Sequence, residues 1–427
     1  MTGALFGTAI MFALLMIGIP IGPIMMSLGM AAGWLNFGWP FMDSIGSILW
    51  GVHNENMLTA IPVFILMGEL LLRAGIADGM YKGLSVWLSG LPGGLLHTNI
   101  GCCAMFAATT GSSVACAATI GTVALPELDK RGYDKAQALG TLAAGGTLGI
   151  LIPPSIALLV YGSLTNNSIS KLFVGGVIPG IILTLCMSAW VLVQNWGKQQ
   201  NREQPTSWQE RLAATPLMLP PFIVFFVVMG SIYFGIATPT EAAALGIAAA
   251  LLFAWKAGKL TLKLLHPCFI RTAQLTGMIL LIITGAFVLN LALSMLGVAQ
   301  AMTKIVTDMN LSLNQLLLAL IVFYIILGCF LDVLAMQVAT IPIVYPIVTS
   351  MGGDAIWLGI FIVLMSEIGM ITPPVGMNLF VIQGVRRDGG PLKDVIKGAF
   401  PYVIIMTLFT LLLMAFPALV TWLPRQM

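Results

Sequence analysis

Long apolar segments alternate with short polar connections along the whole chain. A segment of about 20 apolar residues can cross the hydrocarbon core of a bilayer, and the length of this chain allows roughly ten to twelve such segments. The first one lacks the positively charged start of a signal peptide, and we interpret it as a retained transmembrane helix. The pattern predicts uninterrupted apolar helices over 4–19, 24–40, 57–74, 171–196, 215–235, 240–256, 272–296 and 398–423, with a partly polar connection over 43–56.

Two further apolar segments contain residues that interrupt a membrane helix. Residues 145–155, GGTLGILIPPS, combine three glycines with a Pro-Pro pair, and residues 367–378, EIGMITPPVGMN, contain a second such pair. Glycine weakens a helix, and each proline removes a backbone N–H donor. A spanning segment that unwinds must satisfy its freed carbonyl groups away from lipid. We therefore predict broken helices over 136–165 and 355–384, and two such breaks in one chain are typical of a transporter's binding site.

Two shorter pairs of apolar arms predict re-entrant helical hairpins. Residues 101–122 place a polar centre, TTGSS at 109–113, between two arms that are each too short to span a bilayer. We expect this hairpin to end at Pro126. A second pair of apolar arms runs from 313 to 346 and flanks Asp332, a carboxylate at membrane depth and the one acid that we place there. A charge at that depth is costly and is functional by default.

The spacing of these landmarks indicates an internal repeat. A proline precedes each Pro-Pro pair by 27 residues, at Pro126 and at Pro346. A shift of 220 positions superposes the three prolines of one half on those of the other, and a shift of 221 places Gly111 on Asp332. The order of hairpin, loop and broken helix is the same in both halves, so we predict two structural repeats.

The distribution of basic residues indicates that the two repeats are inverted. The loop after the first hairpin is basic and its counterpart is not, whereas the loop after the second broken helix is basic and its counterpart holds only Lys171. Cytoplasmic loops are enriched in Lys and Arg, so the halves have opposite orientations. We place both termini outside and the linker 197–214 in the cytoplasm. The basic residues concerned are Lys130, Arg131 and Lys135 in the first loop and Arg386, Arg387, Lys393 and Lys397 in the second.

The composition agrees with a polytopic all-α membrane protein and excludes several other classes. The chain is 59% hydrophobic and 8% charged, against about 25% charged residues in soluble proteins. A net charge of +3 spread over loops provides no basic patch for nucleic acid. The six cysteines lie in apolar runs without metal-ligand spacing, and the three histidines lie near segment ends. No histidine forms a plausible dyad with a serine, so we do not expect an intramembrane enzyme.

The hairpin tips and the breaks offer hydroxyl, carbonyl, carboxylate and amide oxygens, which are the ligands of hard cations. Because each tip should approach the broken helix of its own half, and a sodium gradient is the obvious energy source, we predict a Na⁺ site in each half. The first comprises Thr109, Gly111, Ser112, Ser113, Thr147, Gly149 and Pro153, and the second comprises Asp332, Thr372, Gly376 and Asn378. The helix N-termini after the breaks suit an anionic carboxylate. The predicted substrate region comprises Thr110, Ser112, Asp332, Pro154 and Pro374.

Two questions about these residues stay open at the level of sequence. Small and hydroxyl residues also serve simply to let helices pack closely. Asp332 could ligate an ion, titrate, or orient the hairpin. Because Asp332 and Asn378 have no polar counterpart at Gly111 and Leu158, we expect the two sites to be inequivalent, with the second more sensitive to mutation.

The segment 109–162 resembles the signature region of the large membrane subunit of tripartite ATP-independent periplasmic (TRAP) transporters. Segments 61–77, 237–246 and 371–384 are similar to further parts of that family, so the resemblance covers nearly the whole chain. It implies a secondary transporter of the bacterial inner membrane that takes up carboxylates with Na⁺ as the coupling ion. It also implies two partners, a periplasmic substrate-binding protein and a separate small four-helix membrane subunit, as in the unfused type.

The resemblance further implies an elevator mechanism, in which the hairpins and broken helices move together against a scaffold. On this chain the first inverted repeat would be 1–196, with scaffold 1–97 and transport part 98–165, and the second would be 215–427, with scaffold 215–312 and transport part 313–384.

Alternatives to this function are a Na⁺- or H⁺-coupled di- or tricarboxylate symporter that needs no binding protein, and a channel. The substrate class stays open among C4-dicarboxylates, keto acids and sialic acids.

Overall fold

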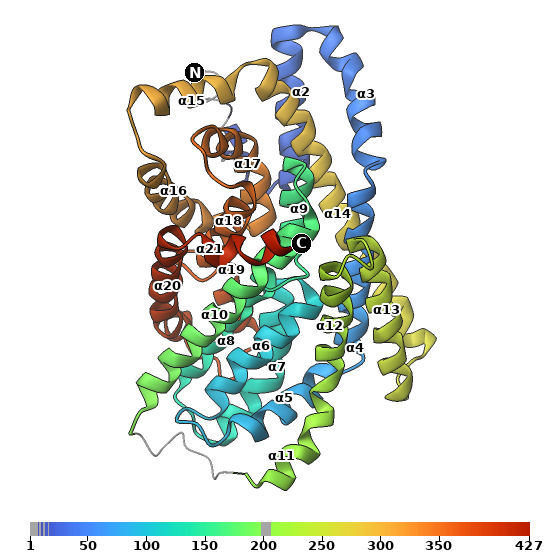
Figure 1. Cartoon of the computed structure of the whole chain (residues 1–427), viewed down its shortest axis with the longest axis vertical. Coiled ribbons are helices and arrows are strands. Elements are labelled where there is room, and N and C mark those ends of the chain that lie inside the picture. The colour runs from blue at the N-terminus through green and yellow to red at the C-terminus, as the bar shows by residue number, and fades with distance from the viewer. Residues whose placement is uncertain (1–6, 8–9, 12, 16, 198–205) are drawn as a thin grey trace.

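The computed structural model describes residues 7, 10–11, 13–15, 17–197 and 206–427, and over these ranges the chain is helical without a β-strand (Figure 1). The predicted helix over 4–19 falls largely outside the described residues, as do residues 198–205 of the predicted linker. The rest of that linker contains a short helix, α11 (Trp208–Ala214), whose Ser207 and Glu210 form a capping box. The all-α fold class expected from the sequence is therefore confirmed over the described residues.

The first half contains a hairpin and a broken helix between longer helices. The hairpin is α6 (Leu95–Thr110) and α7 (Ser113–Lys130), and the broken helix is α8 (Lys135–Leu151) and α9 (Ile156–Thr165). The remaining helices of this half are α2 (Ile21–Phe37), α3 (Trp39–His53), η1 (Asn56–Thr59), α4 (Ala60–Arg73), α5 (Ile76–Leu88) and α10 (Ile169–Asn195).

The second half repeats this order of elements. Its hairpin is α16 (Leu313–Gly328) and α17 (Val333–Ser350), and its broken helix is α18 (Ala355–Met370) and α19 (Met377–Val385). The remaining helices are η2 (Thr215–Leu217), α12 (Leu219–Tyr233), α13 (Pro239–Lys256), α14 (Leu262–Met295), α15 (Val298–Asp308), α20 (Leu392–Ala415), α21 (Ala418–Thr421) and η3 (Leu423–Gln426).

The two halves run in opposite directions along the molecule. In Figure 1, α5 and the first hairpin lie in the lower half, whereas their counterparts α15 and the second hairpin lie in the upper half. The turns before α5 and α15 correspond in detail, because Gly75 (φ 71°) and Gly297 (φ 65°) both adopt the left-handed conformation that favours glycine. These matching turns and opposed positions are those of an inverted repeat.

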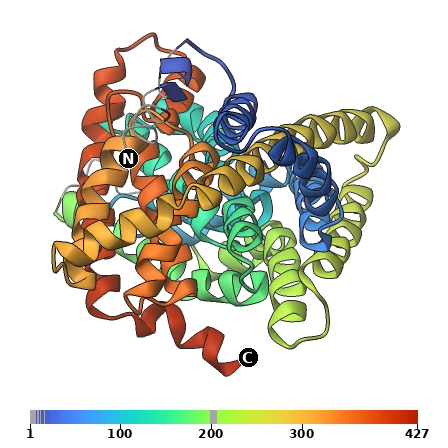
Figure 2. The same cartoon turned by 90° about the horizontal axis from the view of Figure 1, so that it is seen from above.

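The hairpins and broken helices of the two halves interlock. The second arm of the first hairpin, α7, packs against α8 of its own half and against α19 of the other half. In the same way α17 packs against α18 and against α9. A separate group of contacts joins α2 to α14, α4 to α13 and α12 to α13. Viewed from above, this second group lies on one side of the molecule and the orange-red helices of the second hairpin, second broken helix and α20 lie on the other (Figure 2).

The breaks in the two broken helices are shorter than the sequence suggests. Helix α8 continues through all three glycines of residues 145–155, and only residues 152–155 are unwound. The glycines provide space for a neighbour, since a Cβ on Gly146 would lie 2.7 Å from the Cβ of Ala117 on α7. The expectation that Pro126 ends the hairpin is also wrong. Pro126 lies inside α7, which continues to Lys130, as proline in a membrane helix can when neighbours satisfy the freed backbone groups.

Two scaffold segments also differ from the apolar pattern. Residues 43–53, predicted as part of a connection, belong to α3, which begins immediately after α2 at a left-handed Gly38 (φ 64°). Helix α14 begins ten residues earlier than predicted, because Thr261 caps its N-terminus by accepting a hydrogen bond from the Leu264 N–H. Local capping and turn chemistry set both boundaries, and neither is visible in hydropathy alone.

Within the described ranges, six helical segments are long and apolar enough to cross a membrane, or seven if the bent pair 208–217 and 219–233 forms one span. Three shorter apolar helices, α2, α16 and α18, fall below that length. Helices α8 and α18 are the most enclosed part of the molecule, with nearly every residue buried. The first break is also enclosed, since residues 152–155 are buried, whereas the second break is partly or fully exposed over residues 372–375.

Close backbone contact between α8 and α20 leads to a stability prediction. A Cβ on Gly398 would lie 1.8 Å from the carbonyl oxygen of Ala136, and one on Gly140 would lie 2.2 Å from the carbonyl carbon of Gly398. Overpacking of this kind costs about 1–3 kcal/mol. We expect Gly398→Ala to lower the thermal unfolding midpoint of the purified protein by several degrees. As the control, Gly277→Ala on α14 meets no atom within 4 Å and should leave the midpoint unchanged or higher; equal midpoints for both variants would contradict the prediction.

Candidate functional site

The first hairpin tip lies against the break of its own broken helix. Helix α6 ends at Thr110, Gly111 turns the chain with φ 59°, and Ser112 caps α7 by accepting a hydrogen bond from the Ala115 N–H at 3.4 Å. A Cβ on Gly111 would lie 2.9 Å from the carbonyl oxygen of Pro154. A Cβ on Gly149 would lie 2.8 Å from the carbonyl oxygen of Ser112. Only glycine at these two positions allows the tip and the break to approach so closely.

The other residues of the first predicted Na⁺ site have diverse neighbours. The hydroxyls of Thr109 and Thr110 both donate to the Phe106 carbonyl within α6, at 2.7 and 3.2 Å. The Thr147 hydroxyl donates to the Ala144 carbonyl and lies 3.6 Å from the sulfur of Met406 on α20. Pro153 lies next to Gly176 of α10. A Cβ added to Gly176 would be 3.5 Å from the ring of Pro153. The structure thus brings together Gly111, Ser112, Gly149 and Pro154, while Thr147 and Pro153 also contact the surrounding helices.

The second hairpin tip likewise lies against its own break. The carbonyl oxygen of Pro373 accepts a hydrogen bond from the Cys329 thiol at 3.1 Å. Gly328 and Gly369 are in backbone contact, since a Cβ on Gly328 would lie 2.7 Å from the Gly369 Cα. Asp332 follows this turn and caps α17, accepting a hydrogen bond from the Ala335 N–H at 3.3 Å.

Residues around the second break separate into two groups. Thr372 donates its hydroxyl to the Ile368 carbonyl at 2.6 Å, Gly376 caps α19 with φ 33°, and Pro374 is exposed. Asn378 instead is fully buried against the first half, with its amide N–H donating to the Ala143 carbonyl of α8 at 3.4 Å. Its amide oxygen has no hydrogen-bond partner among the described residues.

The structure corrects the register of the two tips. Ser112 and Asp332 are both N-cap residues, both accept from the N–H three residues later, and both begin helices of 18 residues. Asp332 therefore corresponds to Ser112 at a shift of 220, and the alignment with Gly111 is one residue out. The same shift relates Asp134 and Asp354, which cap α8 and α18. The inequivalence between the tips is thus a hydroxyl in one half against a carboxylate in the other.

A second acid at membrane depth was missed from the sequence. Glu367 lies on α18, is fully buried, and accepts a hydrogen bond on Oε1 from the Ser113 hydroxyl, 254 residues earlier in the chain. Its second carboxylate oxygen is buried without a side-chain partner among the described residues, and the backbone of Ile150, near the end of α8, faces the carboxylate. The signal was present, because any acid in an apolar segment is a functional candidate.

The junction around Glu367 joins both halves. Ser113 is the first residue of α7, Ile150 lies at the end of α8, and Glu367 precedes the second break by four residues. Four helix N-termini, those of α7, α9, α17 and α19, begin at the tips and breaks, and helix N-termini carry partial positive charge. Within the described chain no three His, Cys, Asp or Glu residues gather as a metal cluster. The oxygen-rich junction is thus suited to a hard monovalent cation or an organic anion.

Comparisons with known proteins agree with this arrangement. The family described as "Tripartite ATP-independent periplasmic transporter, DctM component" matches residues 8–419. The C4-dicarboxylate TRAP transporter large permease protein DctM of Pseudomonas aeruginosa is 34% identical over 389 residues, which cover 90% of each chain. The sialic acid TRAP transporter permease protein SiaT of Haemophilus influenzae is 30% identical over 426 residues, covering 94% of this chain and 67% of that relative.

A solved structure shows the same fold at low sequence identity. The Alcanivorax borkumensis YdaH transporter, described as having an unusual topology, superposes with a TM-score of 0.60 and 11% identity over 90% of each chain. The relatives are named as transporter permeases, so this chain is a membrane transport component and not an enzyme. Family match, relatives and fold agree, and the chain belongs to the family of DctM components, the large permease subunits of tripartite ATP-independent periplasmic transporters.

Proposed function

We propose that this chain takes up an organic acid across the bacterial inner membrane with Na⁺ as the coupling ion. The observation that carries the proposal is Glu367, a carboxylate that is fully buried at the junction of both halves and has, among the described residues, a side-chain partner for only one of its oxygens. A buried carboxylate is costly unless it is paired, and no basic side chain forms an ion pair with it in the described chain. Either a proton or a bound cation can neutralise such a carboxylate. We propose a cation, because hard cations prefer oxygen ligands of this kind.

The two predicted hairpin tips offer further oxygens for cations. Ser113 already contacts Glu367, and the Ser112 carbonyl, which accepts from the Cys116 N–H, faces Gly149 on α8. In the second half Asp332 provides a carboxylate where the first has a serine hydroxyl. An anionic substrate close to Asp332 would be repelled unless a cation lay between them. We therefore place Asp332 with the ion and the N-termini of α9 and α19 with the substrate carboxylate.

An organic acid is the substrate class that the relatives and the site favour together. The Pseudomonas relative is named for C4-dicarboxylates and the Haemophilus relative for sialic acid, both of which carry carboxylate groups. In tripartite transporters of this kind a periplasmic binding protein would deliver the acid and a small membrane subunit would complete the complex. The basic loops that follow α7 and α19 would face the cytoplasm, with both termini on the periplasmic side.

An elevator motion fits the way in which the helices pack. The cross-contacts α7–α19 and α17–α9 make the two hairpins and two broken helices one interlocked body, which corresponds to residues 98–165 and 313–384. The helices α2, α4, α12, α13 and α14 form a second body through their own contacts. We propose that the first body moves against the second to carry the site between the two membrane faces.

Reconstitution in proteoliposomes tests the whole proposal. With the small subunit and a loaded binding protein outside, steps of external Na⁺ at fixed membrane potential should raise uptake of the acid, sigmoidally if two or more ions bind. Uptake of free substrate by this chain alone would contradict the need for partners. A rate that follows the pH gradient and ignores Na⁺ would replace Na⁺ by H⁺ as the coupling ion.

A substitution of Glu367 tests the cation directly. Glu367→Gln keeps the size of the side chain and an acceptor for the Ser113 hydroxyl but removes the charge. We expect the Na⁺ concentration for half-maximal uptake to rise at least about tenfold, which corresponds to roughly 1.4 kcal/mol, or uptake to be lost with the thermal unfolding midpoint preserved. The control is Glu55→Gln, an exposed acid before η1. An unchanged Na⁺ dependence in folded Glu367→Gln protein would remove the main support for the site.

Substitutions of Asp332 distinguish its role as the N-cap of α17 from the role of its negative charge. Serine at this position is what the first half uses, so Asp332→Ser should retain the cap of α17, whereas Asp332→Ala should lose about 1 kcal/mol of stability. We expect both variants to lose uptake, because both lack the carboxylate. Full uptake by Asp332→Ser, with loss only in Asp332→Ala, would show that Asp332 serves the fold alone.

A further inference from the structure

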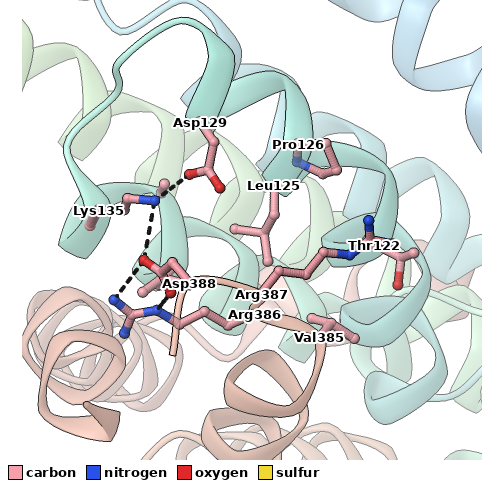
Figure 3. Close-up of a pocket in the computed structure, with 11 residues that line it drawn as sticks. Thr122, Leu125, Pro126, Asp129, Lys135, Val385, Arg386, Arg387 and Asp388 are labelled. Atoms are coloured by element: carbon pink, nitrogen blue, oxygen red, sulfur yellow. Dashed lines mark hydrogen bonds and ion pairs between the residues drawn. The ribbon is translucent and has the colours of Figure 1, made fainter. Parts of the chain in front are cut away.

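Away from the tips and breaks, a cavity of about 190 Å³ opens at the basic end of the molecule (Figure 3). Its walls come from three elements: the second arm of the first hairpin, the start of α8, and the turn that follows α19. Three basic side chains line it against two acidic ones. The cavity therefore combines both halves of the repeat and has a surplus of positive charge.

Most of the charged groups of this cavity are bound to one another. Lys135 lies 2.6 Å from Asp129 and 3.2 Å from Asp388, so that it bridges the two halves. Arg386, only 6% exposed, pairs with Asp388 and, at 2.9 Å, with Asp394. Figure 3 shows Lys135 and Arg386 converging on the Asp388 carboxylate.

Asp388 is held as a permanent anion at the centre of these pairs. The hydrogen bonds from Arg386, assisted by Lys135 and the Gly390 N–H, hold the pKa of Asp388 below its ordinary value. Its oxygens accept from Arg386, Lys135 and the Gly390 N–H, so they have little capacity left for another cation. The charges of this network thus neutralise one another, and within the described chain the network forms no ion pair with the residue before Asp388.

That neighbouring residue, Arg387, is the one basic group of the lining without an ion pair in the described part of the chain. It is exposed, and Figure 3 shows its side chain extending towards Thr122 on the opposite wall. The Thr122 hydroxyl already donates to the Ala118 carbonyl at 2.7 Å, so it does not compete with Arg387 as a donor into the cavity. A guanidinium presents a planar fork of N–H groups that matches a carboxylate or a phosphate in a bidentate fashion.

We propose that this cavity binds an oxyanion, a carboxylate or a phosphate group, with Arg387 as its bidentate partner. Two sources offer this chemistry at the basic end of a membrane protein. One is a soluble organic acid on that side of the membrane, and the other is the headgroup of an anionic phospholipid, which basic pockets between membrane helices commonly bind. The proposal concerns binding only and does not depend on transport.

Arginine modification by phenylglyoxal tests the proposal on the purified full-length chain in nanodiscs without Na⁺. The rate of modification at Arg387 is measured by fragmentation mass spectrometry, with exposed Arg425 as the internal control. In one arm succinate is added to discs of neutral phosphatidylcholine, and in the other the discs contain phosphatidylglycerol and no succinate. A ligand present at about twice its Kd slows modification roughly threefold.

Protection of Arg387 but not of Arg425 supports the site, and the arm in which it occurs identifies the source. Absence of protection in both arms, or equal protection of both arginines, overturns it. Native mass spectrometry provides a second measurement for the lipid arm. Arg387→Gln should reduce retained phosphatidylglycerol, whereas Lys393→Gln, an equal change of charge at an exposed position of α20, should not. Because Na⁺ is absent and no flux is measured, the result stands even if the proposed transport function fails.

Discussion

Inside a bilayer, each helix end leaves backbone groups that lipid cannot satisfy, and this constraint shapes the whole centre of the molecule. The chain meets it by placing each hairpin tip against the break of a broken helix. Glycine at 111 and 149 in one half, and at 328 and 369 in the other, removes the side chains that would keep these backbones apart. Ser112, Ser155 and Asp332 then cap the helices that begin there. Backbone groups and capping side chains thus both contribute to the polar interior at the tips and breaks.

The second theme is that neither repeat is complete without the other. Ser113 of the first half hydrogen-bonds Glu367 of the second, and Asn378 of the second half donates to Ala143 of the first. Lys135 repeats the connection at the basic end through Asp388. The two halves thus contact each other at two depths, and a cation bound at the proposed site would contact elements from both.

The sequence is sufficient to predict the helical elements and their breaks, but not which elements contact each other. Pro-Pro pairs and their spacing located both breaks, and the polar TTGSS run located a tip, because these signals are local. The role of the glycines at 145–149 was misread, since a glycine that permits close packing looks the same in sequence as one that weakens a helix. Glu367 was overlooked because its meaning depends on Ser113, 254 residues away, and no local spacing reports that contact.

The backbone contact of α20 with α8 has a consequence for the bilayer itself. Gly398 and Gly140 bring the backbones of these helices into direct contact, and we therefore assign α20 to the same body as α8. The opposite face of α20 exposes Phe400, Ile404 and Leu408 as an apolar stripe. In an elevator, this stripe would shear past acyl chains on every cycle. The transport rate would then depend on the viscosity and thickness of the bilayer, because lipid would exert friction on the side of the moving body that α20 forms.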